Sequence, residues 1–170
     1  MKNIEKIGFM ALSLIQEQIE QGIDQNEQRY EYSTKTFARP FTSRVKNQKA
    51  LIKAQKLGII TTKSGKRWML IKGGYKAFRT MIGRNPEGDY LQDTGAMLQA
   101  LTVKRKSDTD AVISFSSAKE AQKAFWLSQS GAGRSRKTWK FMGLTERNRK
   151  RLEEYAATLI TTDEVLKVLK

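Results

Sequence analysis

Apolar residues recur every three or four positions over residues 3–23, which is the spacing of an amphipathic helix. Phe9 and Leu12 lie off this stripe, so the first half of the segment is apolar on more than one side. We therefore expect a helix that is either deeply buried or shared with another chain, ending at Gly22 and the polar run after it. The stripe comprises Ile4, Ile7, Ala11, Leu14, Ile15, Ile19 and Ile23.

Two pairs of β-rich runs, each joined by a short polar turn, predict two hairpins. The first pair is Gly58–Thr62 with Arg67–Ile71, and the second is Thr102–Val103 with Ala111–Phe115. Alternation of polar and aromatic residues makes Thr138–Phe141 a further strand candidate.

Helix-start signals predict five more helices. Tyr75–Ile82 follows a glycine pair, and Thr94 can cap a short helix that buries Met97, Leu98 and Leu101. Ser117 with Glu120 forms a capping box for a helix to about Ser128. Thr145 caps a longer helix, and a second capping box at Thr161 with Glu164 predicts a separate final helix.

These elements predict an α+β fold in which helices pack on an antiparallel β-sheet, with a long N-terminal helix and C-terminal helices. We expect one domain over residues 1–160, in which residues 30–66 form a basic, variable arm or loop. Residues 161–170 then form the short C-terminal helix. No internal repeat is visible, and no apolar run approaches the roughly 20 residues that span a bilayer.

The composition argues against catalysis. The chain has no cysteine and no histidine, so it lacks thiolate nucleophiles, the usual general base and the commonest metal ligand. The carboxylate pairs Asp89 with Asp93 and Asp108 with Asp110 lie in turn contexts, where Asp bonds the nearby backbone. We therefore expect no enzyme activity, no catalytic residue, no metal and no cofactor.

Charge is strongly segregated along the chain. There are 32 Lys and Arg against 17 Asp and Glu, and residues 32–86 hold 14 of the basic residues and no acid. Residues 121–151 add nine basic residues against Glu146 alone, whereas the first 31 residues are mildly acidic. Such a field favours nucleic acid, an acidic protein or anionic lipid as partner. A basic surface without a partner stays open as an alternative.

Two segments are the strongest candidates for contact with DNA. One is the first hairpin, and the other is the loop that follows Gly131-Ala132-Gly133, which lacks the Lys-Ser/Thr ending of a phosphate-binding loop. Their cations would bind phosphate without reading bases. Trp68 is expected in the core. The candidate residues are Lys63, Lys66, Arg67 and Lys72 on the hairpin and Arg134, Arg136 and Lys137 on the glycine loop.

The order of five short segments resembles the virion-morphogenesis family of tailed phages, which contains tail-completion or neck proteins. One segment, from Leu91 through Thr94 and Gly95 to Leu98, has the spacing Leu-x-x-Thr-Gly-x-x-Leu of that family. The five segments are Gly22–Asp24, Phe37–Pro40, Gly74–Arg79, Asp89–Leu98 and Phe141–Thr145.

This resemblance implies a structural protein of the virion neck. Because no export signal and no apolar run of bilayer length are visible, we expect it to be made in the host cytoplasm and to have no membrane partner. The resemblance also implies a homo-oligomeric ring around the DNA exit channel, which contacts connector proteins, tail terminator or tube proteins and passing genomic DNA. The alternative is a free-standing basic protein that binds nucleic acid without sequence preference. A carboxylate-dependent nuclease would need acids on the basic face, and residues 32–86 contain none.

Overall fold

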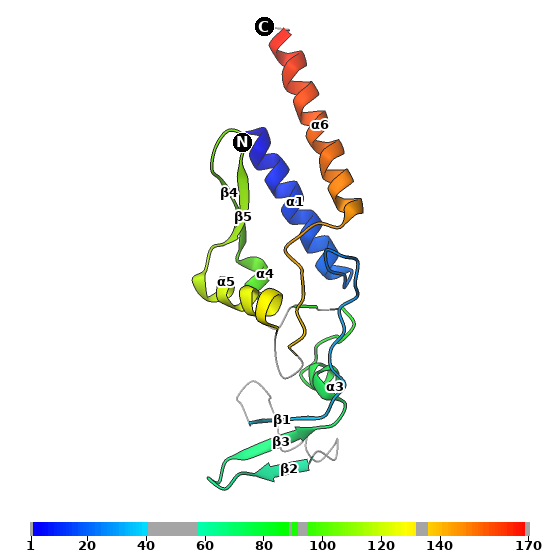
Figure 1. The fold of residues 1–170 in the computed structure, drawn as a ribbon, viewed down its shortest axis with the longest axis vertical. Helices are drawn as coiled ribbons and strands as arrows, with labels where there is room; N and C mark the ends of the chain where they lie inside the picture. The colour runs from blue at the N-terminus through cyan, green and yellow to red at the C-terminus, as the bar shows by residue number, and fades with distance from the viewer. Residues whose placement is uncertain (1, 41–57, 89, 92–94, 132–135, 169–170) are drawn as a thin grey trace. The chain divides into compact units, whose positions relative to one another are not determined.

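The computed structural model is an α+β protein, as the sequence predicts (Figure 1). The structure describes residues 2–40, 58–88, 90–91, 95–131 and 136–168. Where the sequence predicts one domain over residues 1–160, the chain divides into two compact units. Unit 1 comprises Met1–Tyr30 and Tyr90–Lys170, and unit 2 comprises Glu31–Asp89.

Unit 1 is organised around its first helix, α1 (Asn3–Glu20), which begins where the periodicity predicts and ends before Gly22. A hairpin of β4 (Leu101–Arg105) and β5 (Ala111–Phe115) contacts α1. The long helix α6 (Glu146–Val168) also packs on it, so α1 lies between hairpin and helix (Figure 1).

Packing on two sides explains why α1 is apolar on two sides. Leu14, Ile15 and Ile19 are at most 3% exposed, and a side chain at Gly8 would collide with Val103 of β4. Packing within the chain therefore buries most of the apolar surface of α1, and contact with another chain is not needed to explain it. Phe9 is the exception, at 48% exposed.

Three short helices complete unit 1: α4 (Ala96–Gln99), α5 (Ala118–Phe125) and the π-helix η1 (Trp126–Ser130). The predicted cap of α5 is present, because the Ser117 side chain accepts a hydrogen bond from the Glu120 backbone N–H. The prediction of an α-helix to about Ser128 is corrected at Trp126, where the helix widens into the π form.

The described residues of unit 2 form a three-stranded antiparallel sheet and one helix. The strand order is β1 (Phe37–Pro40), β3 (Arg67–Ile71), β2 (Gly58–Thr61), so the predicted hairpin pairs and β1 joins the other side of β3. Helix α3 (Gly74–Met81) begins directly after the hairpin. The core of unit 2 is formed by Met69, Ile71, Phe78 and Met81, with Phe37, Tyr75, Ala77 and Ile82 packed against it.

Three further expectations are corrected. The described strands form two sheets, and Thr138–Phe141 joins neither. Residues 30–66 are not simply an arm, since they contribute β1 and β2. The chain does not break at Thr161 either: α6 is one helix from Glu146 to Val168, so the capping-box pattern at 161–164 starts no new helix. Residues that continue an established helix need no cap, because their N–H groups already have partners.

Candidate nucleic-acid interface

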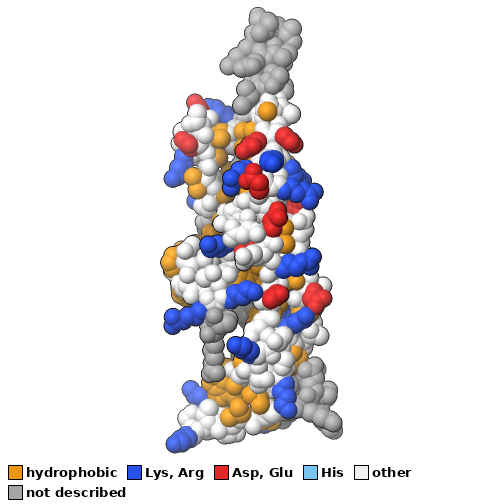
Figure 2. Space-filling view, turned by 45° about the vertical axis from the view of Figure 1, so that its right-hand side comes forward, with side chains coloured by type: hydrophobic (Ala, Val, Ile, Leu, Met, Phe, Trp, Pro, Cys, Tyr) orange, Lys and Arg blue, Asp and Glu red, His pale blue; other side chains and the backbone are white. Residues whose placement is uncertain are grey.

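The positive charge of the protein is concentrated in unit 2. This unit holds 14 basic and three acidic residues, whereas unit 1 holds 18 basic and 14 acidic residues. Figure 2 shows Lys and Arg side chains around the strands of unit 2, without acidic side chains among them on the face that is drawn. The net positive charge of unit 2 therefore favours polyanions more strongly than the nearly balanced charge of unit 1 does.

The turn of the β2–β3 hairpin is held by local hydrogen bonds. The Thr62 N–H donates to the Lys66 carbonyl at 2.9 Å, and the Lys66 N–H donates to Thr62 Oγ1 at 3.1 Å. Gly65 has φ +74°, a conformation that L residues rarely adopt, and its N–H donates to the Thr62 carbonyl. The sequence Lys-Ser-Gly-Lys therefore forms a tight turn that directs its lysines into solvent.

All four hairpin candidates are exposed, but they do not form one cluster. Lys63, Lys66 and Arg67 lie at the turn end of the ladder, where Arg67 is opposite Thr61. Lys72 follows the last residue of β3, at the other end of that strand. The cations therefore lie at both ends of the hairpin. A polyanion that runs along the hairpin can contact them through several of its phosphates.

The three candidates on the glycine loop belong to unit 1, not to the unit that carries the hairpin. Arg136 and Lys137 are exposed, and Arg136 has a positive φ of 46°. Arg134 lies outside the described residues. The Trp139 N–H donates to the Leu127 carbonyl at 2.9 Å, which ties the chain after the loop to η1.

Trp68 is half-buried, and its indole Nε1 is enclosed with no hydrogen-bond partner among the residues that the structure describes. It lies on the sheet face opposite Met69, because neighbouring strand residues point to opposite faces. The expectation that Trp68 belongs to a core is thus met only in part, and the half-buried ring offers less surface for stacking on bases than an exposed one would.

The start of α6 carries a further group of basic residues. Arg147, Arg149 and Lys150 are exposed, and Arg149 approaches Glu146 at 3.4 Å. Arg151 is different, since its guanidinium binds both carboxylate oxygens of Glu17 at 2.9–3.0 Å. Arg151 therefore ties α6 to α1 and is not available as a polyanion ligand.

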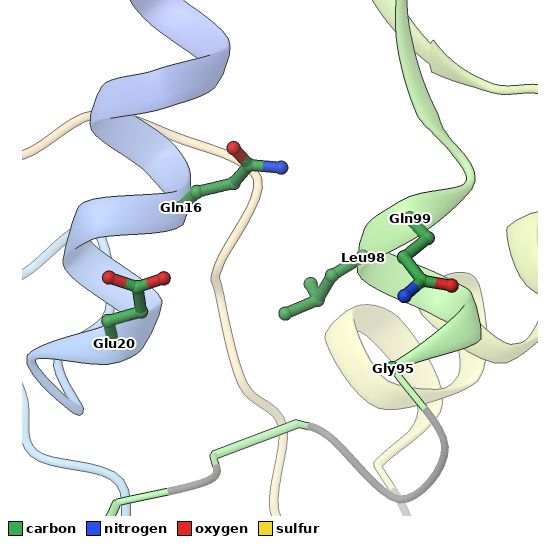
Figure 3. A pocket seen from close by; sticks show the side chains of 5 residues that line it. All are labelled: Gln16, Glu20, Gly95, Leu98 and Gln99. Atoms are coloured by element: carbon green, nitrogen blue, oxygen red, sulfur yellow. The ribbon is translucent and has the colours of Figure 1, made fainter.

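Unit 1 also has an open hollow of about 210 Å³ between α1 and α4 (Figure 3). It is lined by Gln16, Glu20, Gly95, Leu98 and Gln99. Among the described residues that line the hollow, Glu20 is the one charged group, and they supply no pair of carboxylates for acid–base chemistry.

The carboxylates considered in the sequence have structural partners where they are described. Asp108 accepts from Lys2 Nζ at 2.7 Å and from Arg105, and these cations lower the pKa of its carboxyl. Asp110 accepts from the Ser107 hydroxyl at 2.8 Å, within the β4–β5 turn. Asp89 and Asp93 lie outside the described residues. Among the residues that the structure describes, no group of three or more acids could hold a metal ion.

Comparison of the chain with protein families, with curated proteins and with solved structures finds no match. The resemblance to phage neck proteins therefore rests on the order of its five short segments. Within the described part of the chain, no helix combines the length and the apolar character needed to cross a membrane.

Proposed function

We propose that the protein is a non-enzymatic structural component of the head–tail neck of a tailed phage. It assembles as a ring around the DNA exit channel, and unit 2 supplies a basic surface toward the passing genome. The observation that carries this proposal is the concentration of charge in unit 2, with 14 basic against three acidic residues.

Such a surface suits a DNA conduit for a physical reason. Exposed lysines and arginines attract phosphates by releasing condensed counterions, an effect that does not depend on base sequence. The hairpin offers cations but no exposed aromatic or amide set that would read base edges. Binding of this kind holds DNA weakly enough for it to move along the surface.

Assembly would use surfaces other than the buried faces of α1. Phe125 and Trp126 are each 54% exposed where α5 meets η1, and Phe9 is 48% exposed on α1. Exposed aromatic residues are the commonest anchors of protein interfaces. These residues support a contact of unit 1 with neighbouring copies, with connector proteins, or with tail terminator or tube proteins.

The DNA contact is tested by the salt dependence of binding to two duplexes of unrelated sequence. Replacing Lys63, Lys66, Arg67 and Lys72 by alanine should reduce the slope of log affinity against log salt by about 0.9 for each phosphate that the variant no longer neutralises. The reduction should be equal on both duplexes. The matched control removes four exposed lysines of unit 1, and it should leave the slope nearly unchanged. These control positions are Lys104, Lys106, Lys119 and Lys140.

The virion role is tested separately, by locating the protein in purified particles and measuring its assembly state. A ring at the neck, and unjoined heads and tails when the protein is missing, support the proposal. A stable monomer or dimer that binds DNA but is absent from particles would instead establish the free-standing nucleic-acid-binding protein.

A further inference from the structure

The two edge strands of the unit 2 sheet differ in how they are protected. β1 ends in Pro40, which has no N–H, and its Arg39 guanidinium lies over the Phe78 ring at 4.1 Å from the centroid. Natural sheets use proline and inward charges in this way to prevent unwanted pairing. β2 has the sequence Gly-Ile-Ile-Thr, with neither a charge nor a proline. Of the two edges, β2 is therefore the one that lacks such protection in its own sequence.

The ladder determines which backbone groups of β2 point outward. The bond from the Thr62 N–H to the Lys66 carbonyl marks a hydrogen-bonded pair. Since such pairs alternate in an antiparallel ladder, Ile60 and Gly58 also bond to β3. Ile59 and Thr61 then direct their N–H and C=O groups away from β3. No strand in the described part of the chain pairs with this edge.

The side chains of β2 leave apolar surface on both faces of the edge. Ile59 is 41% exposed and Ile60 is 43% exposed. They point to opposite faces, because side chains alternate along a strand. A strand added beside β2 would cover both isoleucines and satisfy the outward backbone groups at the same time.

The charge around the edge restricts what such a strand can be. Lys63, Lys66 and Arg67 lie at one end of the ladder, and Lys72 lies beyond the other. Two copies that paired through this edge would bring these like charges together, which opposes association. A polypeptide with acidic residues at both ends of a short apolar strand would be attracted instead.

We propose that the outer edge of β2 accepts an added β-strand from an acidic partner polypeptide. Backbone bonds to Ile59 and Thr61 supply affinity, the two isoleucines select apolar side chains, and the bracketing cations select flanking Asp or Glu. This interaction goes beyond the DNA contact, because it needs the backbone of β2 and not only the cations of the turn.

The first experiment maps amide exchange by NMR in the full chain. The probe is a synthetic nine-residue peptide of alternating Thr and Val with Asp and Glu at both ends. Strand addition should protect the amides of Ile59 and Thr61, while those of Gly58 and Ile60, already bonded to β3, change little. The same peptide with proline in place of its central Val should not bind. Absence of protection at Ile59 and Thr61, or equal binding of the proline peptide, overturns the proposal.

Variants of β2 separate strand addition from DNA binding. Thr61→Pro removes an outward N–H without removing a hydrogen bond between β2 and β3, and it should weaken peptide binding about tenfold. The control Thr61→Val keeps this N–H, so this variant should bind the peptide as the parent chain does. Ile59→Lys, which adds a protecting charge to the edge, should also weaken peptide binding about tenfold. Unchanged amide protection of Gly58 and Ile60 verifies the fold of each variant.

A duplex DNA titration forms the second arm. DNA affinity should be the same for Thr61→Pro and the parent chain, because phosphate contacts use the side chains of the turn. If Thr61→Pro left peptide binding intact, or if DNA protected Ile59 and Thr61 as the peptide does, strand addition would be rejected. Failure of the proposed DNA contact would appear separately, as an unchanged salt slope in the lysine and arginine variants of the hairpin.

Discussion

Gln18 and Asn148 lie 130 residues apart in the sequence, yet Asn148 Nδ2 donates a buried hydrogen bond of 2.9 Å to Gln18 Oε1. The same Gln18 oxygen accepts from the Thr145 N–H at 2.9 Å, and Gln18 Nε2 donates to the Gly143 carbonyl at 3.0 Å. Gln18 is 1% exposed and Asn148 is 4% exposed. One side-chain amide on α1 therefore binds the first turn of α6 and sets how the two helices align.

We expect Gln18→Leu to lower the free energy of unfolding by about 2–4 kcal/mol, because it removes the side-chain acceptor of the buried Thr145 N–H and the shorter of the two hydrogen bonds of Asn148 Nδ2, whose other acceptor is the Leu14 carbonyl at 3.4 Å. Denaturant unfolding followed by circular dichroism measures this. Gln21→Leu, at an exposed position of the same helix end, should change stability by less than about 0.5 kcal/mol. Gln18→Leu combined with Asn148→Leu should cost less than the sum of the two single changes. Additive costs would show that the two amides act independently.

Gly74→Ala should be far more damaging than Gly65→Ala, although both glycines have φ between +71° and +74°. A Cβ at Gly74 would collide with the backbone of Ser33 and Thr34, whereas nothing lies within 4 Å of a Cβ at Gly65. Backbone strain alone predicts about 1–2 kcal/mol at Gly65, and the added collision raises the cost at Gly74 to about 2–5 kcal/mol. Equal losses in urea unfolding would contradict the close approach at Gly74.

Tyr30→Phe should leave the protein as stable as before or more stable by up to about 1 kcal/mol. The Tyr30 hydroxyl is buried without a partner in the described structure, while its ring stacks on Trp139 at 4.8 Å between centroids. Phenylalanine keeps the ring and removes the unsatisfied group. Tyr30→Ala, which also removes the ring, should cost about 3–5 kcal/mol in thermal or chemical unfolding. A clear loss of stability in Tyr30→Phe would reveal a partner for the hydroxyl.

The same residue predicts a pH dependence. Burial, and secondarily the charge of Asp24, raise the pKa of the Tyr30 hydroxyl above its ordinary value. Its contribution to stability is therefore fully present below the pKa of an unfolded tyrosine, about 10, and is lost as the pH rises beyond it. Tyr30→Phe should show a shallower loss of stability above this pH than the parent chain. Parallel pH profiles would contradict the raised pKa.

For Asp108 we expect a pH dependence of stability with the opposite sign. Its hydrogen bond from Lys2, and then the charges of Lys2 and Arg105, lower the pKa of this exposed carboxyl. The resulting stabilisation is present above the ordinary pKa of Asp and disappears as the pH falls through the lowered value. Lys2→Met should raise the pKa of Asp108 in a carboxyl NMR titration. Lys6→Met removes the same charge elsewhere on α1 and should leave that pKa in place.

Local signals in the sequence predict many elements of the structure. The periodicity over residues 3–23 marks α1, and the alternation around residues 63–66 marks the β2–β3 hairpin. Thr145 caps α6 as predicted, since its hydroxyl accepts from the Asn148 N–H at 3.2 Å. Each of these features depends on residues close together in the chain, so one stretch of sequence contains all the interacting groups.

Elements that depend on distant partners could not be predicted in the same way. β1 ends in proline and becomes a strand because Ile71, more than thirty residues away, pairs with Phe37. The capping-box pattern at 161–164 is overridden by the continuing helix α6, whose earlier turns pack on α1. The structural role of Gln18 could not be predicted from the sequence. Its side-chain amide lies within an apolar stripe, and its hydrogen-bond partner Asn148 belongs to α6, far away in the chain.

The same distinction between local and distant interactions applies to the candidate nucleic-acid interface. The sequence by itself determined that one part of the protein is strongly basic, because the 14 cations of unit 2 lie in one continuous segment. Only the tertiary structure decided that no described strand pairs with the outer edge of β2 and that the backbone groups of Ile59 and Thr61 point away from β3. Net charge is a sum over residues and needs no coordinates, whereas the direction of a backbone hydrogen bond depends on which strand lies beside it.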